Sequence, residues 1–169
     1  IITESSQMTT ALENGSIDMS WAVRTDDLPS FQEGGAKAGD FWVYQVPDNL
    51  VSQIFCNCSE DKLTSNADLR KAIYYAIDAN MILQSVYNGN GIVTHDVARP
   101  KCPDYAEEWA NEDNYYNFNL EKAKEHMAAS GYKEGEVTLS LMCEATDAMS
   151  DTAVLIQALL EQIGVKVDI

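Results

Sequence analysis

Four cysteines and two histidines are the side chains of this 169-residue sequence best suited to covalent or metal chemistry: Cys56, Cys58, Cys102, Cys143, His95 and His126. A cysteine nucleophile needs a neighbouring base, so either histidine would serve only if the fold brought it beside a thiol. His126 ends the charged run EKAKEH, which is typical of a solvated helix surface. The sequence also contains no G-x-S-x-G, H-E-x-x-H, P-loop or dinucleotide-binding glycine pattern. We therefore expect no catalytic residues and no enzymatic activity.

The pair Cys56 and Cys58 is the only close pair of potential metal ligands. On a strand, a spacing of two positions places both sulfurs on the same face. A zinc knuckle instead has two residues between its cysteines and a second knuckle nearby, and this chain has neither. We expect no metal site and no cofactor.

The strongly negative net charge of the chain limits the kinds of molecule that it is expected to bind. The chain has 27 acidic and 11 basic residues, a formal net charge of -16 and a pI near 4.2. Nucleic acid is excluded as a partner, because a phosphate backbone is held by clustered lysine and arginine side chains. The acidity favours a solvated surface that resists aggregation, with an acidic site for cations as the alternative. No apolar run approaches the roughly 18 residues of a membrane span.

A helix, a glycine and a strand follow one another three times along the chain. The three units are residues 6–23 with Gly15, residues 121–143 with Gly131 and residues 152–169 with Gly164. Glycine after an amphipathic stretch is a helix stop, and alternating apolar residues such as Val165, Val167 and Ile169 indicate a half-buried strand. Repetition of this order predicts an α/β fold in which helices cover a sheet.

Two apolar stretches add further expected strands. FWVYQV (41–46) and LVSQIFCNC (50–58) are separated only by PDN, which predicts two strands joined by a tight turn and paired antiparallel. The predicted sheet is therefore mixed and flanked by helices.

Residues 66–87 are predicted to form two successive helices. Ser65 precedes the first, with Asp68 three residues later, in the arrangement of a capping box. The apolar stripe consists of Leu69, Ala72, Ile73, Ala76 and Ile77, and Met81, Ile82 and Val86 continue it after a break near Asp78. These side chains are expected to be scaffolding, with a buried face.

Four blocks of the chain resemble the family 5 extracellular solute-binding proteins, the oligopeptide, dipeptide and nickel receptors of ABC importers. The blocks are ALENGSIDM (11–19), ADLRKAIYYAIDANMILQSVYNGNG (67–91), NLEKAKEHMAASGYKEG (119–135) and IQALLEQIGVKVDI (156–169). They are similar to the family's leucine-glycine-"ID" element, its "AID" helix pair, its "KAKELLAEAGY" helix and its "LQEQLKKIGIKVEI" segment. The four blocks occur in the family's order and span nearly the whole chain.

The resemblance implies a type II periplasmic-binding-protein fold, of which residues 1–169 are a single domain, most of the second of two lobes, with the first lobe absent. It implies a monomeric extracytoplasmic receptor, periplasmic or membrane-anchored as a lipoprotein, that delivers short peptides to the permease subunits of an ABC transporter. A nickel chelate or another small solute is the alternative ligand. A ligand-free interaction domain is the alternative of a different class.

The same resemblance indicates ligand-binding residues. Ligands of α/β sheets gather at the carboxyl ends of strands, and the stretch LMCEATDAMSD (141–151) follows such an end. Laid against the peptide receptors, Glu144 and Met149 fall near positions that face the cleft, and so do Gln53 and Phe55 on one face of the SQIFCNC strand. A shift of one residue in this alignment would place Gln53 and Phe55 on the opposite face of the strand, away from the cleft.

Other roles for these side chains stay open. Phe55 is also suited to the core, Gln53 and Glu144 to solvent, and Met149 to capping the core end of its helix. Export, which the resemblance implies, permits disulfides without requiring them. We expect at most one, with Cys58 and Cys102 as a possible pair.

Overall fold

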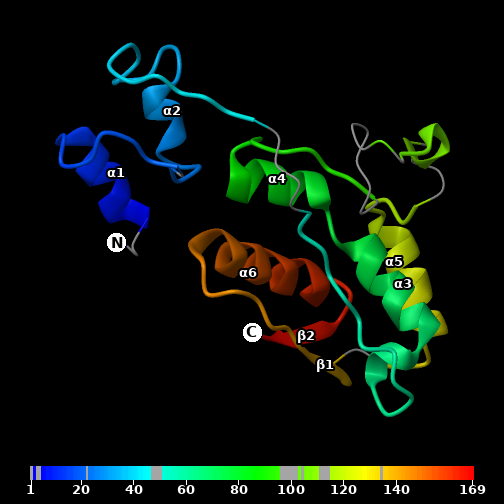
Figure 1. Cartoon of the computed structure of the whole chain (residues 1–169). Helices are drawn as coiled ribbons and strands as arrows, with labels where there is room; N and C mark the ends of the chain where they lie inside the picture. The colour runs from blue at the N-terminus through cyan, green and yellow to red at the C-terminus, as the bar shows by residue number, and fades with distance from the viewer. Residues whose placement is uncertain are drawn as a thin grey trace.

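The computed structural model describes residues 2, 5–21, 23–46, 51–95, 103, 105–110, 115–133 and 135–169 (Figure 1). Its elements follow in this order: α1 (Ser5–Glu13), α2 (Leu28–Phe31), η1 (Leu63–Ser65), α3 (Ala67–Ala76), α4 (Ala79–Tyr87), η2 (Glu107–Ala110), α5 (Leu120–Ala129), β1 (Val137–Ser140), α6 (Asp147–Glu161) and β2 (Val165–Asp168). Among the described residues, no helix is both long enough and apolar enough to cross a membrane.

The carboxyl-terminal third forms a β1-α6-β2 unit. The two strands are parallel, with Val137 opposite Val165 and Ser140 opposite Asp168. Helix α6 packs along this pair with a buried stripe: Ala153, Ile156, Leu159 and Leu160. Gly164 joins α6 to β2 with a φ of 77°, a conformation that glycine adopts without steric cost. The sequence predicted this helix, stop and strand correctly.

Helices α3 and α5 lie side by side and complete the core (Figure 1). The buried face of α3 consists of Leu69, Ala72, Ile73 and Ala76. It shares one apolar cluster with Ala123 and Met127 of α5, Ile156 of α6, and Val137 of β1. The stripe is confirmed on α3, and in its predicted continuation Val86 is buried and Ile82 is half-buried. The prediction is wrong for Met81, which is 43% exposed, because α4 is a separate helix that buries Val86. The break is confirmed: the Asp78 side chain caps α4 by accepting a hydrogen bond from Met81 N at 3.0 Å.

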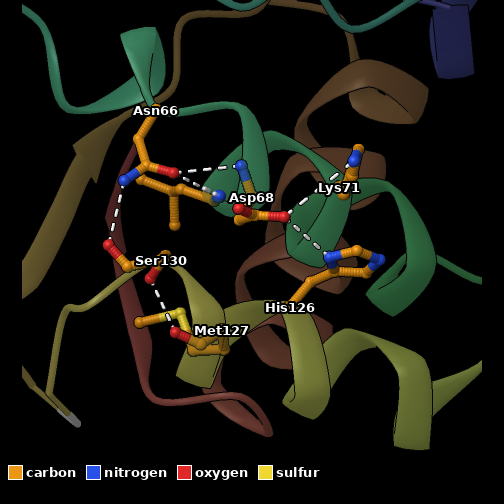
Figure 2. A network of polar contacts seen from close by, with 7 residues as sticks. Asn66, Asp68, Lys71, His126, Met127 and Ser130 are labelled. Carbon is orange, nitrogen blue, oxygen red and sulfur yellow. Dashed lines mark hydrogen bonds and ion pairs between the residues drawn. The ribbon is translucent and has the colours of Figure 1, made fainter.

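The cap of α3 lies one residue later than the sequence predicted. Ser65 belongs to the 3₁₀ turn η1, whereas Asn66 has the extended backbone of an N-cap. Asn66 Oδ1 accepts hydrogen bonds from Asp68 N at 3.0 Å and Leu69 N at 3.1 Å. Asn66 Nδ2 also donates to the carbonyl of Ser130 at 2.9 Å, which joins the start of α3 to the end of α5 (Figure 2).

His126 on α5 is not the solvated surface residue that its charged neighbours suggested. Its Nδ1 lies 2.9 Å from Asp68 Oδ1 (Figure 2). Its ring also stacks on that of Tyr75, with centroids 5.6 Å apart. Lys71 approaches the same carboxylate at 3.9 Å. The difference arises from tertiary structure, because α3 and α5 pack together along these side chains. The residues adjacent to His126 in the sequence do not predict this contact.

The α/β class is confirmed, but the sheet in the described residues is the parallel pair β1–β2. Described residues of 17–23, 41–46 and 51–58, which we expected to be strands, form no ladder within the described part of the chain, apart from one bridge between Ala38 and Phe41. Alternating apolar residues fit a strand only when a neighbouring strand and a buried face are available. Residues 42–46 are instead exposed, including Trp42 and Tyr44, which stack on each other.

The amino-terminal part contains α1 and α2. The predicted helix over Met8 and Leu12 is confirmed as α1, and Gly15 ends it with a φ of 74°. Polar contacts link the segments around α2 to the end of α4: Thr25 to the Val86 carbonyl, Asn88 to Asp26, and Gln45 to Asn90. This end of α4 is therefore where the amino-terminal part meets the core.

Candidate functional site

The loop after β1 lies at the edge of the sheet where both strands have their carboxyl ends. Leu141 N donates to the Asp168 carbonyl at 2.7 Å, so the loop leaves the sheet directly beside the end of β2. Beyond it, Met142 is 95% exposed and Glu144 is exposed. The predicted loop therefore stands at the expected edge, with its carboxylate in solvent.

Helix α6 begins immediately after this loop. Thr146 is its N-cap, and its Oγ1 accepts a hydrogen bond from Met149 N at 3.3 Å. The first N–H groups of a helix have no partner inside it and carry partial positive charge. The Glu144 carbonyl accepts a hydrogen bond from Thr146 N at 2.9 Å. Glu144 therefore lies two residues before the N-cap of α6 and close in sequence to its free backbone N–H groups. A carboxylate and helix N–H groups are together suited to a ligand with both a cation and an anion.

Met149 lies in the first turn of α6 and is half-buried. Its backbone serves the cap, while the buried stripe of α6 starts at Ala153. Met149 thus lies between the exposed loop and the core, a position compatible with either role considered for it.

The second pair of predicted residues lies on the extended segment 51–59. Gln53 is exposed and Phe55 is 85% exposed, so Phe55 is not a core residue here. Ile54 and Cys56, which alternate with them, are half-buried, and Ile54 packs against the main core. The segment therefore has the two-sided character of a strand without a partner strand, with Gln53 and Phe55 on its outer side.

Two contacts fasten this segment to α3 and the turn before it. Thr64 Oγ1 donates to the Asn57 carbonyl at 2.6 Å, and the Tyr74 hydroxyl donates to Cys56 Sγ at 3.7 Å. Burial raises the pKa of Tyr74 to about 12, and the hydrogen bond to Cys56 and the charges of Cys56 and Cys58 act in the same direction. Arg70 opposes them weakly. No local sequence pattern predicts the contact between Tyr74 and Cys56, which lie 18 positions apart.

Tyr74 should make stability depend on pH in alkaline solution. Because its pKa is raised from 10.0 to about 12 on folding, its stabilising contribution is complete below pH 10 and is lost as pH rises through about 12. We expect the free energy of unfolding to fall more steeply across this interval in the wild type than in Tyr74→Phe. Urea unfolding at a series of pH values measures this difference, and equal slopes for the two proteins would contradict it.

The two pairs of predicted residues are not joined into one network. Within the described part of the chain, no hydrogen bond, ion pair or ring contact links Gln53 or Phe55 to Glu144 or Met149. Cys56, Cys58 and Cys143 are free thiols, whereas Cys102, and with it the possible Cys58–Cys102 pair, lies outside the described residues. Among the described residues, no group of three or more His, Cys, Asp or Glu side chains is placed to hold a metal ion.

The whole chain matches one protein family. The family described as bacterial extracellular solute-binding proteins, family 5 Middle, matches residues 1–169. A comparison with curated proteins finds no match.

Solved structures with the same fold are also similar to this chain. NikZ from Campylobacter jejuni, in complex with Ni(L-His), has a TM-score of 0.68 at 18% identity over 99% of this chain and 34% of its own. AppA from Bacillus subtilis, in complex with a nonapeptide, has a TM-score of 0.68 at 20% identity over 99% and 34%. AgaA from A. tumefaciens R10, in complex with agropinic acid, has a TM-score of 0.50 at 35% identity over 62% and 21%. The chain thus spans about a third of the first two proteins and about a fifth of the third.

Proposed function

Because the chain belongs to the family 5 extracellular solute-binding proteins, we propose that it is the ligand-binding lobe of an extracytoplasmic receptor that delivers short peptides to an ABC transporter. The observation that carries the proposal is the match of this family, one of binding proteins, to the whole of residues 1–169. The peptide-bound AppA, which shares the fold over 99% of the chain, supports a peptide as ligand.

The chemistry of the loop 141–151 also favours a peptide. Glu144 offers a negative charge for an amino group, and the N-terminus of α6 offers N–H donors for a carboxylate. The loop contains no lysine or arginine that would hold a phosphate or a purely anionic ligand. A zwitterion with separated charges is the ligand class that this surface matches.

The proposed receptor is monomeric and has two lobes, of which residues 1–169 form most of the second. This proposal is supported by the share of NikZ and AppA that the chain covers, 34% in each. A ligand held between two lobes would contact Gln53, Phe55, Glu144 and Met149 from one side only. The first lobe would then supply contacts that the second lobe lacks.

A nickel chelate is the second candidate ligand, because NikZ was solved with Ni(L-His) and shares the fold. The described residues contain no cluster of metal-binding side chains, so they would contact a nickel complex through its chelating ligand. Titration of the complete receptor with short peptides and with nickel-histidine separates the two candidates. A receptor that binds neither would leave another small solute as ligand, or the ligand-free interaction domain.

Glu144→Gln should weaken peptide binding by the complete receptor more than about fivefold, since it removes the charge that pairs with the amino group. Gln53→Ala should weaken binding less, because it removes only a neutral hydrogen-bonding group. Calorimetric titration measures both, and the thermal unfolding midpoint should change little because both side chains are exposed.

Glu161→Gln is the matched control, because it makes the same change at an exposed position at the other end of α6. It should leave peptide affinity unchanged. Equal affinity of the Glu144→Gln and Glu161→Gln receptors would exclude Glu144 from the site, although the family would stand.

A further inference from the structure

Cys56 and Cys58 are two free thiols separated by one residue. Cys56 is half-buried and Cys58 is exposed. The thiol of Cys58 donates a hydrogen bond to the carbonyl of Cys56 at 3.4 Å. The Cys58 side chain therefore turns back along the chain toward residue 56.

Two hydrogen bonds hold the chain at Asn57, between the two cysteines. Asn57 Oδ1 accepts a hydrogen bond from Ser59 N at 3.0 Å, and the Asn57 carbonyl accepts from Thr64 Oγ1 at 2.6 Å. In a fully extended chain, the Cα atoms of residues i and i+2, such as Cys56 and Cys58, are about 7 Å apart. A disulfide needs about 4.4–6.8 Å, so a modest bend suffices to bring the cysteines within range.

The absence of a strand here makes this bend possible. Residues 51–59 form no ladder with any other described residue, so drawing the two sulfurs together breaks no sheet hydrogen bond there. In a regular strand the two side chains would point the same way but would be held apart by the extended backbone.

We infer that Cys56 and Cys58 form an intrachain disulfide when the protein meets a small-molecule disulfide such as oxidised glutathione. The exposed Cys58 thiolate attacks one sulfur of the oxidant, forms a mixed disulfide and releases one glutathione thiolate. The Cys56 thiolate then attacks the Cys58 sulfur, which forms the Cys56–Cys58 bond and expels the second glutathione thiolate. The two cysteines lose two electrons and two protons, and the oxidant becomes two glutathione thiols.

The surroundings of the two cysteines suit Cys58 to react first with the oxidant and Cys56 to close the disulfide. Cys58 is exposed and reaches a solution oxidant first, whereas Cys56 is half-buried and its sulfur accepts the Tyr74 hydrogen bond at 3.7 Å. Tyr74 belongs to α3, so this contact holds the second sulfur on the fixed core. The short separation along the chain favours closure over reaction with Cys143, which lies on the loop after β1.

The bridge would stiffen the backbone just after Gln53 and Phe55. Its small ring would replace a segment held by the contacts of Asn57 with one whose bend is covalently fixed. Oxidation would thus alter the freedom of a segment on the outer side of the core without changing α3. The inference stands on the thiol geometry and does not depend on which ligand the protein binds.

Peptide mapping of the 169-residue chain tests the inference, because trypsin separates the cysteines. Cleavage after lysine and arginine leaves Cys56 and Cys58 together in peptide 38–62, Cys102 in 102–122 and Cys143 in 134–166. After equilibration with oxidised glutathione and alkylation, peptide 38–62 should be lighter by two hydrogen atoms and carry no alkyl group. We expect this form to exceed the open form by about tenfold or more, and reduction before alkylation should abolish it.

Two variants make the result specific. Cys102→Ser should leave the bridged 38–62 peptide unchanged, whereas Cys58→Ser should eliminate it and leave Cys56 open to alkylation. A cross-link between 38–62 and either other cysteine peptide, a disulfide dimer, or full alkylation of both thiols after oxidation would each overturn the inference.

Discussion

Leu69→Ala is expected to lower the free energy of unfolding by about 2–5 kcal/mol. Leu69 is 0% exposed and lies in the same buried cluster as Met127 of α5 and Ile156 of α6. Truncation removes apolar contacts with both helices and leaves a cavity that neighbours on three elements cannot easily fill. Urea unfolding followed by circular dichroism measures the loss.

Ile73→Ala should fall in the same range, because Ile73 is 3% exposed on the same face of α3. Val154→Ala is the matched control, since Val154 is an apolar helix residue that is 56% exposed. It should change stability by no more than about 0.5 kcal/mol. Losses below half a kcal/mol for both core variants would mean that the α3 stripe is not the centre of the core.

The helices were predictable because their signals are local. The residues that signal the α3 stripe, the break at Asp78 and the stop at Gly164 lie inside these helices or within a few residues of their ends. Even here the cap was misplaced by one position. The turn η1 uses Ser65 and passes the capping role to Asn66, and both residues are common caps, so composition alone does not choose between them.

The strands were predicted less well because a strand is defined by its neighbour. Val137 and Val165 form a ladder, since α6 brings the two segments side by side. Residues 42–46 are equally rich in aromatic and β-branched side chains but have no partner strand among the described residues. Period-two patterning reports a preference for a half-buried pleated surface, whereas the identity of the adjacent strand is a property of the whole fold.

The candidate site was predictable only in part. Alternation correctly predicted that Gln53 and Phe55 share a side, and the strand-end argument correctly predicted that Glu144 follows β1. Their role in binding stays a prediction. The Asp68–His126 contact joins residues 58 positions apart, so no window of local sequence reports it.

Asn66→Ala should lower the free energy of unfolding by about 2 kcal/mol, more than the loss of an ordinary helix cap. The substitution removes the acceptor for Asp68 N and Leu69 N and also the donor to the Ser130 carbonyl. A cap is worth about 1 kcal/mol, and a lost bond that strands a partly buried carbonyl adds a comparable cost. Thermal and urea unfolding both report the change.

Asn119→Ala supplies the matched comparison, because Asn119 caps α5 through Lys122 N at 3.0 Å and is exposed. It should cost only about 1 kcal/mol. Asn66→Ser separates the two functions of Asn66, since serine is a good N-cap but its short side chain lacks the amide donor that bonds Ser130. An intermediate loss for Asn66→Ser would assign the excess to the bond between α3 and α5. If Asn66→Ala instead cost no more than Asn119→Ala, the Asn66–Ser130 bond would contribute nothing to stability, and the two helices would be held by their apolar contacts alone.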